Sequence, residues 1–357
     1  MPGRWVGGKV WIESGGGRVN DGVTTLVIGA NDYAGAWAVD QRGRGVNPVQ
    51  PGGETTLYTD FRYAEAAQSV AGVAVEMTKR ALTIDLGEKL NGTVQFEADV
   101  LPYLEWERLT AGKAKLVPTR GIVDSVRAIK DEEEVATLRK AARIADRGLE
   151  ALTAETWVGR SELELAWRLH ELLHAHGAHA LSFPSIVASG SNGALPHAHP
   201  TEAIVEKGSL VTVDWGAHVD GYNSDCTRTF STGGSLPDEL RRAYDVCLDA
   251  QLKAVAGIKA GITGIEADAI ARDPITAAGF GDNFGHGLGH GLGLAVHEAP
   301  RLSTESTDTL EVGHSVTIEP GIYLPGLGGV RIEDMAIVRE DGVELLTSFR
   351  KDLIEVR

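Results

Sequence analysis

The sequence predicts an α+β fold for the larger, C-terminal part of the chain, and two observations support this class. Apolar residues recur at helical spacing in 130–152 and 161–176, and a third helix is expected at 237–256. Between and after these helices, runs rich in β-branched residues and separated by glycine-containing turns indicate strands. A mixture of helices and antiparallel hairpins is typical of the α+β class.

The bulk composition limits the kinds of protein that this chain can be. Its 357 residues correspond to about two domains, and 43% hydrophobic with 24% charged residues is usual for a globular protein. We see no apolar run of 18 residues and no signal-peptide-like stretch near the N-terminus, so we expect a cytoplasmic protein that does not span a membrane. The net charge of −16 argues against nucleic acid as the main partner, and some of the 50 acidic residues could instead hold cations.

Cysteine does not explain the function. Cys226 and Cys247 are the two cysteines of the sequence, and neither lies in a CxxC motif. The sequence therefore predicts neither a disulfide framework nor a zinc site built on thiolates.

The first ~125 residues are expected to form a unit of their own. The segments 23–29 and 56–61 are rich in Val, Thr and aromatic residues and indicate strands. A helix then begins within the charged run from Lys130 to Glu134, with apolar positions at Val135, Leu138, Ala142, Ile144 or Ala145, and Leu149. We therefore place the boundary just before this helix and predict domains at 1–125 and 126–357.

The helix at 161–176 contains the pattern HExxH. Ser161 and Glu164 form a capping box at its start, and Gly177 can end it. His170 and His174 have the spacing of a zinc protease site. The extended form of that site needs a histidine three residues after the glycine, whereas His179 comes one residue early. On a helical wheel the two histidines lie away from the face formed by Leu165, Leu169, Leu172, Leu173 and His176. We interpret the motif as a chance match on the helix surface.

Two predicted hairpins each carry a pair of acids. In 211–230, Asp214 and Asp225 are equally far from a turn near Val219–Gly221, so the two carboxylates are expected to face each other within a residue of register. In 315–338, Glu319 and Glu333 are symmetric about Gly326. One such pair could be a turn or solvent-face feature, but two similar pairs favour a cage of four carboxylates for divalent metal ions.

A histidine-glycine stretch at 284–300 can complete this cage. Its glycines alternate with His286, Leu288, His290 and Leu292, which does not fit the G-x-G-x-x-G dinucleotide fingerprint. Alternating glycines favour an extended segment with a bare side that backbone or ligand can approach. His286 would then project to the same side as His290, and His297 follows seven residues later. One imidazole with four carboxylates suits two Mn(II), Co(II) or Zn(II) ions, which can activate water and polarise a carbonyl.

These motifs resemble those of the pita-bread metallopeptidases, a family that includes Xaa-Pro dipeptidase (prolidase), aminopeptidase P and methionine aminopeptidase. The resemblance covers about 125–357 and includes GY-x-S-D-x-T-R-T, G-H-G-x-G and E-P-G. It implies a pita-bread catalytic domain and two divalent metal ions, with Mn(II) preferred to Co(II) or Zn(II). The implied metal ligands are Asp214, Asp225, His290, Glu319 and Glu333. Of these, Asp225 and Glu333 would bridge the two ions.

The resemblance also implies roles around the metals. Glu319 would be the general base and acid, and His297 would stabilise the tetrahedral intermediate. His197, within VASGSNGALPHAHP, and His286 would contact substrate. Arg331 shares a strand face with Glu333, which predicts either a salt bridge that orients Glu333 or a contact with the substrate carboxylate.

The N-terminal part resembles the family's smaller α/β domain more weakly. TDFRYAEAA (59–67) and VRAIKDEEEVATLRKAA (126–142) carry this resemblance, whereas the first ~20 residues match poorly. The extra domain argues against methionine aminopeptidase, and the five intact ligands argue against creatinase or a metal-free binding module. We therefore expect a homodimeric hydrolase of Xaa-Pro dipeptides, with aminopeptidase P action on longer peptides as the alternative. Arg42 and Arg44 are candidates for closing the site of a partner subunit.

Overall fold

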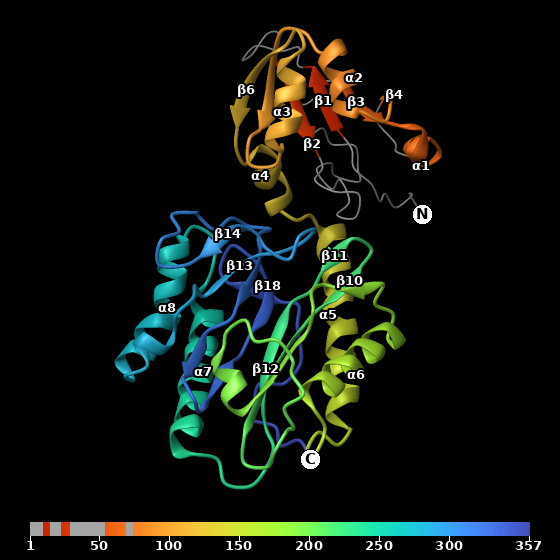
Figure 1. Ribbon diagram of the computed structural model, residues 1–357. Helices are drawn as coiled ribbons and strands as arrows, with labels where there is room; N and C mark the ends of the chain where they lie inside the picture. The colour runs from red at the N-terminus through yellow and green to blue at the C-terminus, as the bar shows by residue number, and fades with distance from the viewer. Residues whose placement is uncertain (1–9, 15–22, 29–53, 69–73) are drawn as a thin grey trace. The chain divides into compact units, whose positions relative to one another are not determined.

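The computed structural model describes residues 10–14, 23–28, 54–68 and 74–357. The chain divides into two compact units, Met1–Arg127 and Ala128–Arg357 (Figure 1). Arg42, Arg44 and most of the first ~20 residues lie outside the described part of the chain. Among the described residues, no helix is both long and apolar enough to cross a membrane.

The N-terminal unit contains a mixed six-stranded sheet in the order β4-β3-β1-β2-β5-β6. β1 pairs antiparallel with β2 and β3, and the other neighbouring strands pair parallel. The segments predicted as strands at 23–29 and 56–61 correspond to β2 and β3. The strands are β1 Val10–Ser14, β2 Val23–Ile28, β3 Glu54–Thr59, β4 Ala74–Met77, β5 Thr93–Glu97 and β6 Lys115–Thr119.

Short helices accompany this sheet. Leu86 of α2 and Leu109 of α3 share a buried cluster with Val94 and Phe96 of β5, so these two helices pack on the sheet. The helices are η1 Phe61–Tyr63, α1 Ala64–Gln68, α2 Leu82–Lys89, α3 Tyr103–Thr110 and α4 Ile122–Ala128.

The C-terminal unit consists of two helix pairs and a set of antiparallel strands. The helices are α5 Glu132–Thr153, α6 Glu162–Ala175, η2 Gly190–Ala194, α7 Asp238–Gly257, α8 Gly264–Ala277 and η3 Gly281–Asn283. The strands before α7 are β7 Ala180–Leu181, β8 Ile186–Ser189, β9 Leu210–Trp215, β10 Ala217–Val219, β11 Tyr222–Asn223 and β12 Cys226–Ser231. Those after α8 are β13 Gly289–Gly291, β14 Glu298–Leu302, β15 Ser315–Ile318, β16 Gly321–Leu324, β17 Gly328–Arg331, β18 Asp334–Val338 and β19 Val343–Leu345.

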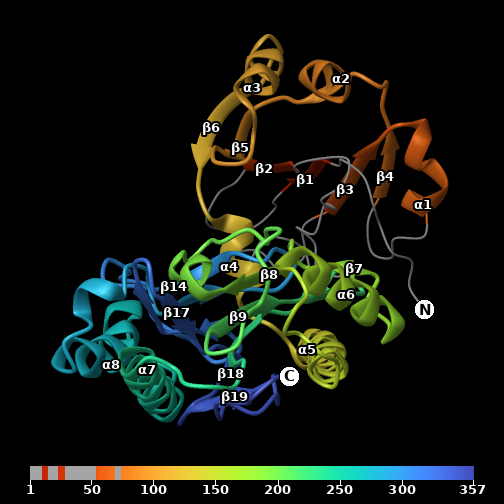
Figure 2. The ribbon, with the colours of Figure 1, turned by 60° about the horizontal axis from the view of Figure 1, so that its bottom comes forward.

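Helices cover the strands of this unit from two sides (Figures 1 and 2). Leu149 of α5 and Leu165 of α6 share one buried cluster with β9 and β12. Tyr244 of α7 and Ala271 of α8 share another with β15 and β17. Each half of the unit thus supplies two helices followed by a hairpin, and the hairpins lie between the helix pairs. This arrangement confirms the α+β class.

Capping explains where the first two of these helices begin. Asp131 caps α5 and Glu134 reciprocates, whereas Ser161 and Glu164 form the predicted box on α6. Gly177, with a φ of 107°, follows α6 in the left-handed region that glycine tolerates. All the apolar positions predicted for α5 are buried.

The helix α8 was not predicted from the sequence. This helix contains Pro274, which lacks the N–H that would continue the backbone hydrogen bonds. Thr263 caps it in a capping box with Glu266, so the start signal was present in the sequence.

Candidate metal centre

The first hairpin brings Asp214 and Asp225 together, with a register different from the predicted one. Asp214 lies on β9 and pairs with Thr227 of β12. The turn is centred on Asp220 and Gly221, whose φ angles are 52° and 94°, one residue later than predicted. The two acids were predicted to face each other within one residue of register. This is wrong, because Asp225 lies two positions from Thr227, the partner of Asp214, and the two acids are diagonal neighbours.

A glycine allows the two strands to approach each other at this point. Any Cβ at Gly216 would overlap the carbonyl oxygen of Ser224, the residue before Asp225. Gly216 therefore lets the chain pass close enough for the diagonal carboxylates to converge.

The second hairpin has the predicted centre. β16 and β17 pair from Gly321 with Arg331 to Leu324 with Gly328, which is symmetric about Gly326. Glu319 and Glu333 both lie just beyond the Gly321–Arg331 end of this ladder, between it and the β15–β18 ladder, which has the same centre. The Glu319 N–H donates to the carbonyl of Leu288, and the Glu333 N–H donates to the carbonyl of Thr227. The second hairpin is thus hydrogen-bonded both to the first hairpin and to the histidine-glycine stretch.

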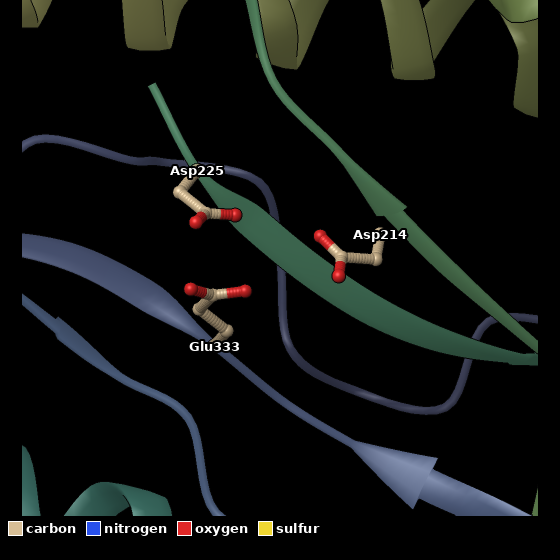
Figure 3. A group of neighbouring side chains, drawn as sticks. All are labelled: Asp214, Asp225 and Glu333. Carbon is tan, nitrogen blue, oxygen red and sulfur yellow. The ribbon is translucent and has the colours of Figure 1, made fainter. Parts of the chain in front are cut away.

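The carboxylates of Asp214, Asp225 and Glu333 point toward one another (Figure 3). Oxygens of Asp214, Asp225 and Glu333 lie within 4.8 Å of one another. Burial raises the pKa of Asp225 well above its usual value, and the neighbouring carboxylates of Glu333, Asp214 and Glu319 raise it further. Burial and the carboxylates of Glu319 and Asp214 likewise raise the pKa of Glu333. Like charges this close are costly to ionise without a cation.

His290 joins Glu319 to this cluster. Its Nε2 lies 3.3 Å from Glu319 Oε1 and 3.7 Å from Asp225 Oδ2. Its Nδ1 lies 3.0 Å from the carbonyl oxygen of Gly291, a contact that turns Nε2 toward the acids. Burial acts to raise the pKa of Glu319, but the hydrogen bond and charge of His290 prevail and lower it to about 2. All five predicted ligands therefore belong to one contiguous cluster.

The alternating glycines let backbone pass close to the histidine-glycine stretch, as predicted. A Cβ at Gly287, Gly289 or Gly291 would overlap the carbonyl oxygens of Leu302, Thr317 or Ala299, respectively. Regular strand is limited to β13, and the register to β14 shifts between His290 and Gly291.

The other predicted histidines lie around the cluster. His286 Nε2 is 2.9 Å from the Tyr323 hydroxyl, and burial lowers the pKa of His286. The His297 ring meets the His290 ring edge-on at 4.4 Å, and burial together with the charge of His290 lowers the pKa of His297. His197 is exposed in the loop that follows η2.

Arg331 bonds to a different carboxylate from the one predicted. Its Nη2 lies 2.8 Å from Asp214 Oδ2, so the predicted salt bridge with Glu333 is wrong. Nε donates to Thr227 Oγ1, and Nη1 donates to the Tyr323 hydroxyl and the Pro196 carbonyl. This buried guanidinium thus holds Asp214 in place, and its suggested contact with a substrate carboxylate stays a prediction.

Thr227 is a supporting residue that was not predicted from the sequence. Its hydroxyl donates to Glu333 Oε2 at 2.7 Å and accepts from Arg331. The missed signal was strand alternation, because Thr227 is two residues after Asp225 and shares its face.

The HExxH pattern does lie on the surface of α6. Leu165, Leu169, Leu172 and Leu173 form its buried face. The His170 ring contacts the rings of Trp167 and His174 at 5.1 and 4.8 Å. His176, which the helical wheel placed with the leucines, is exposed at the end of the helix. Among the described residues, the side chains that are grouped closely enough to hold a metal ion are Asp214, Asp225 and Glu333 of the acidic cluster. The histidines of the HExxH pattern are not among them.

The donor set of the acidic cluster fits divalent cations. Asp214 Oδ1 and Glu333 Oε1 are buried and accept no hydrogen bond from the described residues. Buried carboxylate oxygens that converge without donors are stabilised when a cation or a proton neutralises them. Carboxylates with one imidazole are ligands that Mn(II), Co(II) and Zn(II) accept.

Comparison with known proteins agrees with this geometry. The model of metallopeptidase family M24 matches residues 136–340, and the creatinase/prolidase N-terminal domain model matches residues 39–129. The chain belongs to metallopeptidase family M24. This confirms the predicted pita-bread fold and the smaller N-terminal domain, and it makes the chain a metallopeptidase.

The similar members of the M24 family include several Xaa-Pro peptidases. The chain is 38% identical to a Xaa-Pro dipeptidase from Pyrococcus horikoshii, over 85% of this chain and 86% of that protein. It is also similar to the solved structure of a Xaa-Pro dipeptidase from Bacillus anthracis, with a TM-score of 0.82 and 42% identity over 85% of this chain and 87% of the other. An X-Pro aminopeptidase from Thermotoga maritima gives a TM-score of 0.78 and 33% identity over 86% and 89% of the two chains.

Proposed function

We propose that this M24 peptidase is a metal-dependent Xaa-Pro dipeptidase that hydrolyses the bond before proline in short peptides. The observation that carries the proposal is the cluster of Asp214, Asp225, His290, Glu319 and Glu333, which supplies four carboxylates and one imidazole in a buried setting. The names of the relatives at 38–42% identity support proline-containing substrates.

In this proposal, the cluster holds two divalent ions. Asp214 would complete one site, His290 and Glu319 the other, and Asp225 and Glu333 would serve both. Mn(II) is the proposed metal, with Co(II) or Zn(II) as alternatives, because the donor set is rich in oxygen and contains one nitrogen. When bound, such a pair supplies Lewis-acid polarisation of the scissile carbonyl and activation of water.

Side chains in and around the cluster would transfer the proton, stabilise the developing charge and contact the substrate. Glu319 takes the proton of the attacking water and returns it to the proline nitrogen, which has no hydrogen of its own in the peptide. His297 stabilises the negative charge that develops on the carbonyl oxygen. His197 and His286 contact the substrate, and Arg331 keeps Asp214 in position through its 2.8 Å ion pair.

The alternative is an aminopeptidase P that accepts longer Xaa-Pro-Xaa peptides. The similarity to the Thermotoga enzyme favours this reading, but its identity of 33% is lower than that to the dipeptidases.

The proposal also includes domains at 1–125 and 126–357, a homodimer, a cytoplasmic location, and neither nucleic acid nor membrane as a partner. Arg42 and Arg44 are proposed to limit substrate length from the partner subunit.

A substrate panel tests this proposal. The purified protein is incubated with Mn(II) and with Xaa-Pro dipeptides, Xaa-Pro-Xaa tripeptides and Met-peptides, and the products are quantified. We expect cleavage of Xaa-Pro dipeptides with the highest kcat/KM. Preference for tripeptides would assign the chain to the aminopeptidase P class, and cleavage of none would favour a binding module.

A further inference from the structure

We propose that Glu162 is a positioning residue that fixes the loop carrying His197 beside the metal-binding cluster. The inference rests on the proposed function, because His197 is assigned there as a substrate contact. It deepens that function by naming the residue that holds this contact in place.

The Glu162 side chain is fully buried at the first turn of α6 and is saturated with hydrogen bonds. Its Oε1 accepts from the backbone N–H of Ser189 at 2.6 Å and from the Ser189 hydroxyl at 2.9 Å. Its Oε2 accepts from the Asn192 side-chain amide at 2.7 Å, from the Thr201 N–H at 2.9 Å and from the Thr201 hydroxyl at 2.7 Å. One carboxylate therefore receives five hydrogen bonds from three residues of a single loop.

These bonds are not needed to cap the helix. Ser161 already caps α6, and Glu164 reciprocates by accepting from the Ser161 N–H at 2.8 Å. The Glu162 carboxylate is directed at the loop instead. A buried carboxylate is tolerated only when it is fully hydrogen-bonded or paired, and here every partner donates to it.

The two ends of the loop are fastened by Glu162, and its middle is fastened to the metal-binding cluster. Between Ser189 and Thr201 the chain passes through η2, Pro196 and His197. The Pro196 carbonyl accepts from Arg331 Nη1 at 3.1 Å, and Nη2 of the same guanidinium pairs with Asp214.

Backbone packing adds to this middle anchor. A Cβ at Gly329 of β17 would overlap the carbonyl oxygen of Gly193 in η2, so the loop lies directly on the second hairpin. His197, which is exposed, follows the anchored Pro196 by one residue. Its position is therefore determined by Arg331 on one side and by the Glu162 anchor on the other.

Glu162→Gln tests the anchor with almost no change in volume. The backbone N–H groups of Ser189 and Thr201 donate to different oxygens of Glu162. In either orientation of a glutamine amide, its NH₂ group would face one of these donors and lose that bond. We expect the variant to release one end of the loop.

Leu172→Ala is the matched control. Leu172 is buried on the same helix, ten residues or about 15 Å further along its axis. This control removes packing from α6 without touching the loop, so it separates a general loss of stability from a loss of positioning.

Hydrogen exchange measures the anchoring without any substrate. In Glu162→Gln, amides within 189–203 should exchange about tenfold or more faster than in the wild type, whereas amides of α7 should keep their rates. Leu172→Ala should show no selective effect at 189–203. Unchanged exchange of this segment in Glu162→Gln would overturn the proposal.

A double-mutant cycle then measures the link to His197. We expect Glu162→Gln and His197→Ala each to lower kcat/KM for a Xaa-Pro dipeptide roughly 10- to 100-fold. The double variant should fall no more than about twofold below His197→Ala, because a misplaced loop no longer matters once its histidine is gone. If instead the loss of kcat/KM in the double variant equals the product of the two single losses, Glu162 acts independently of His197, and the proposal is overturned.

The two measurements separate this inference from the proposed function. If the wild type cleaves no Xaa-Pro peptide, the proposed function fails, and hydrogen exchange still decides whether Glu162 anchors the loop. If the wild type cleaves these peptides and the exchange or the cycle fails, the inference about Glu162 fails alone.

Discussion

At the scale of single residues, the candidate site depends on polar side chains whose supporting contacts were not predicted from the sequence. Thr227 and Arg331 hold Glu333 and Asp214, respectively, and neither supporting residue is predicted as a metal ligand. The types and spacing of the five ligands could be predicted from their motifs. The partner of Arg331 could not, because the strand pattern gives the face of a residue and leaves open which neighbouring strand it meets.

His314 gives a pH-dependent prediction away from the metal cluster. Burial, together with the charge of Lys130, lowers the pKa of His314 to about 4. In the unfolded chain His314 has an ordinary pKa near 6.5, so below that pH the unfolded state takes up a proton that the folded state does not. The contribution of His314 to stability is therefore complete above about pH 6.5 and is lost as the pH falls toward 4. We expect the free energy of unfolding to fall by roughly 1–2 kcal/mol from this residue between pH 7.5 and pH 5.

The control for this prediction keeps the hydrogen bond of His314. Its Nδ1 accepts from the Glu311 N–H at 2.9 Å, and an asparagine oxygen can take that role in His314→Asn. Urea unfolding of both proteins at pH 7.5 and pH 5 isolates the contribution of the histidine. Equal losses in the two proteins would show that His314 does not titrate as described.

At the scale of elements, local signals predicted the helices well and the hairpin register less well. Capping residues and apolar spacing predicted α5 and α6. The helix α8 was not predicted, because it contains Pro274, a residue that usually interrupts a helix. The first hairpin was predicted one residue off centre because Asp220 adopts a positive φ of 52°. Asp-Gly is a strong sequence signal for a two-residue turn in which both residues have positive φ, so the sequence contained this information and the prediction did not use it.

A buried ion pair joins the start of α5 to β14. Lys130 Nζ lies 2.8 Å from Glu298 Oε2, and both side chains are 1% exposed. In Lys130→Met the Glu298 carboxylate would lose this buried cation, and we expect a loss of about 3–5 kcal/mol in the free energy of unfolding. Chemical denaturation measures this loss.

The double variant Lys130→Met/Glu298→Gln serves as the control for that prediction. Removing both charges should restore part of the lost stability, because no unpaired charge is then buried. A single variant as stable as the wild type would contradict the importance of this pair.

At the scale of the whole catalytic unit, the metal cluster connects its two halves. Asp214 and Asp225 come from the first hairpin, and Glu333 comes from the second. Motif spacing predicted that these distant segments meet. The anchoring of the His197 loop by Glu162 could not be predicted, because a glutamate in the first turn of a helix is ordinarily explained by the helix dipole.

Metal removal should therefore lower the stability of the whole unit. A ligand at 100 times its Kd stabilises a protein by about 2.7 kcal/mol, so we expect Mn(II) to raise the unfolding temperature of protein first stripped with a chelator. Asp225→Asn should lose most of this increase. The substitution removes one of several buried carboxylates that repel one another. The metal-free Asp225→Asn variant should therefore unfold at a higher temperature than the metal-free wild type. An equal increase with Mn(II) in both proteins would exclude Asp225 as a ligand.

We propose that this cluster, with bound metal, hydrolyses Xaa-Pro dipeptides, and a metal titration is the decisive test of that activity. Metal-free protein is titrated with Mn(II) while release of proline from a Xaa-Pro dipeptide is measured, beside Glu319→Ala. We predict no hydrolysis without metal, activity that saturates at about two ions per chain, and neither hydrolysis nor full metal binding in Glu319→Ala. Hydrolysis that persists in the chelated wild type, or full activity of Glu319→Ala with metal added back, would contradict the account.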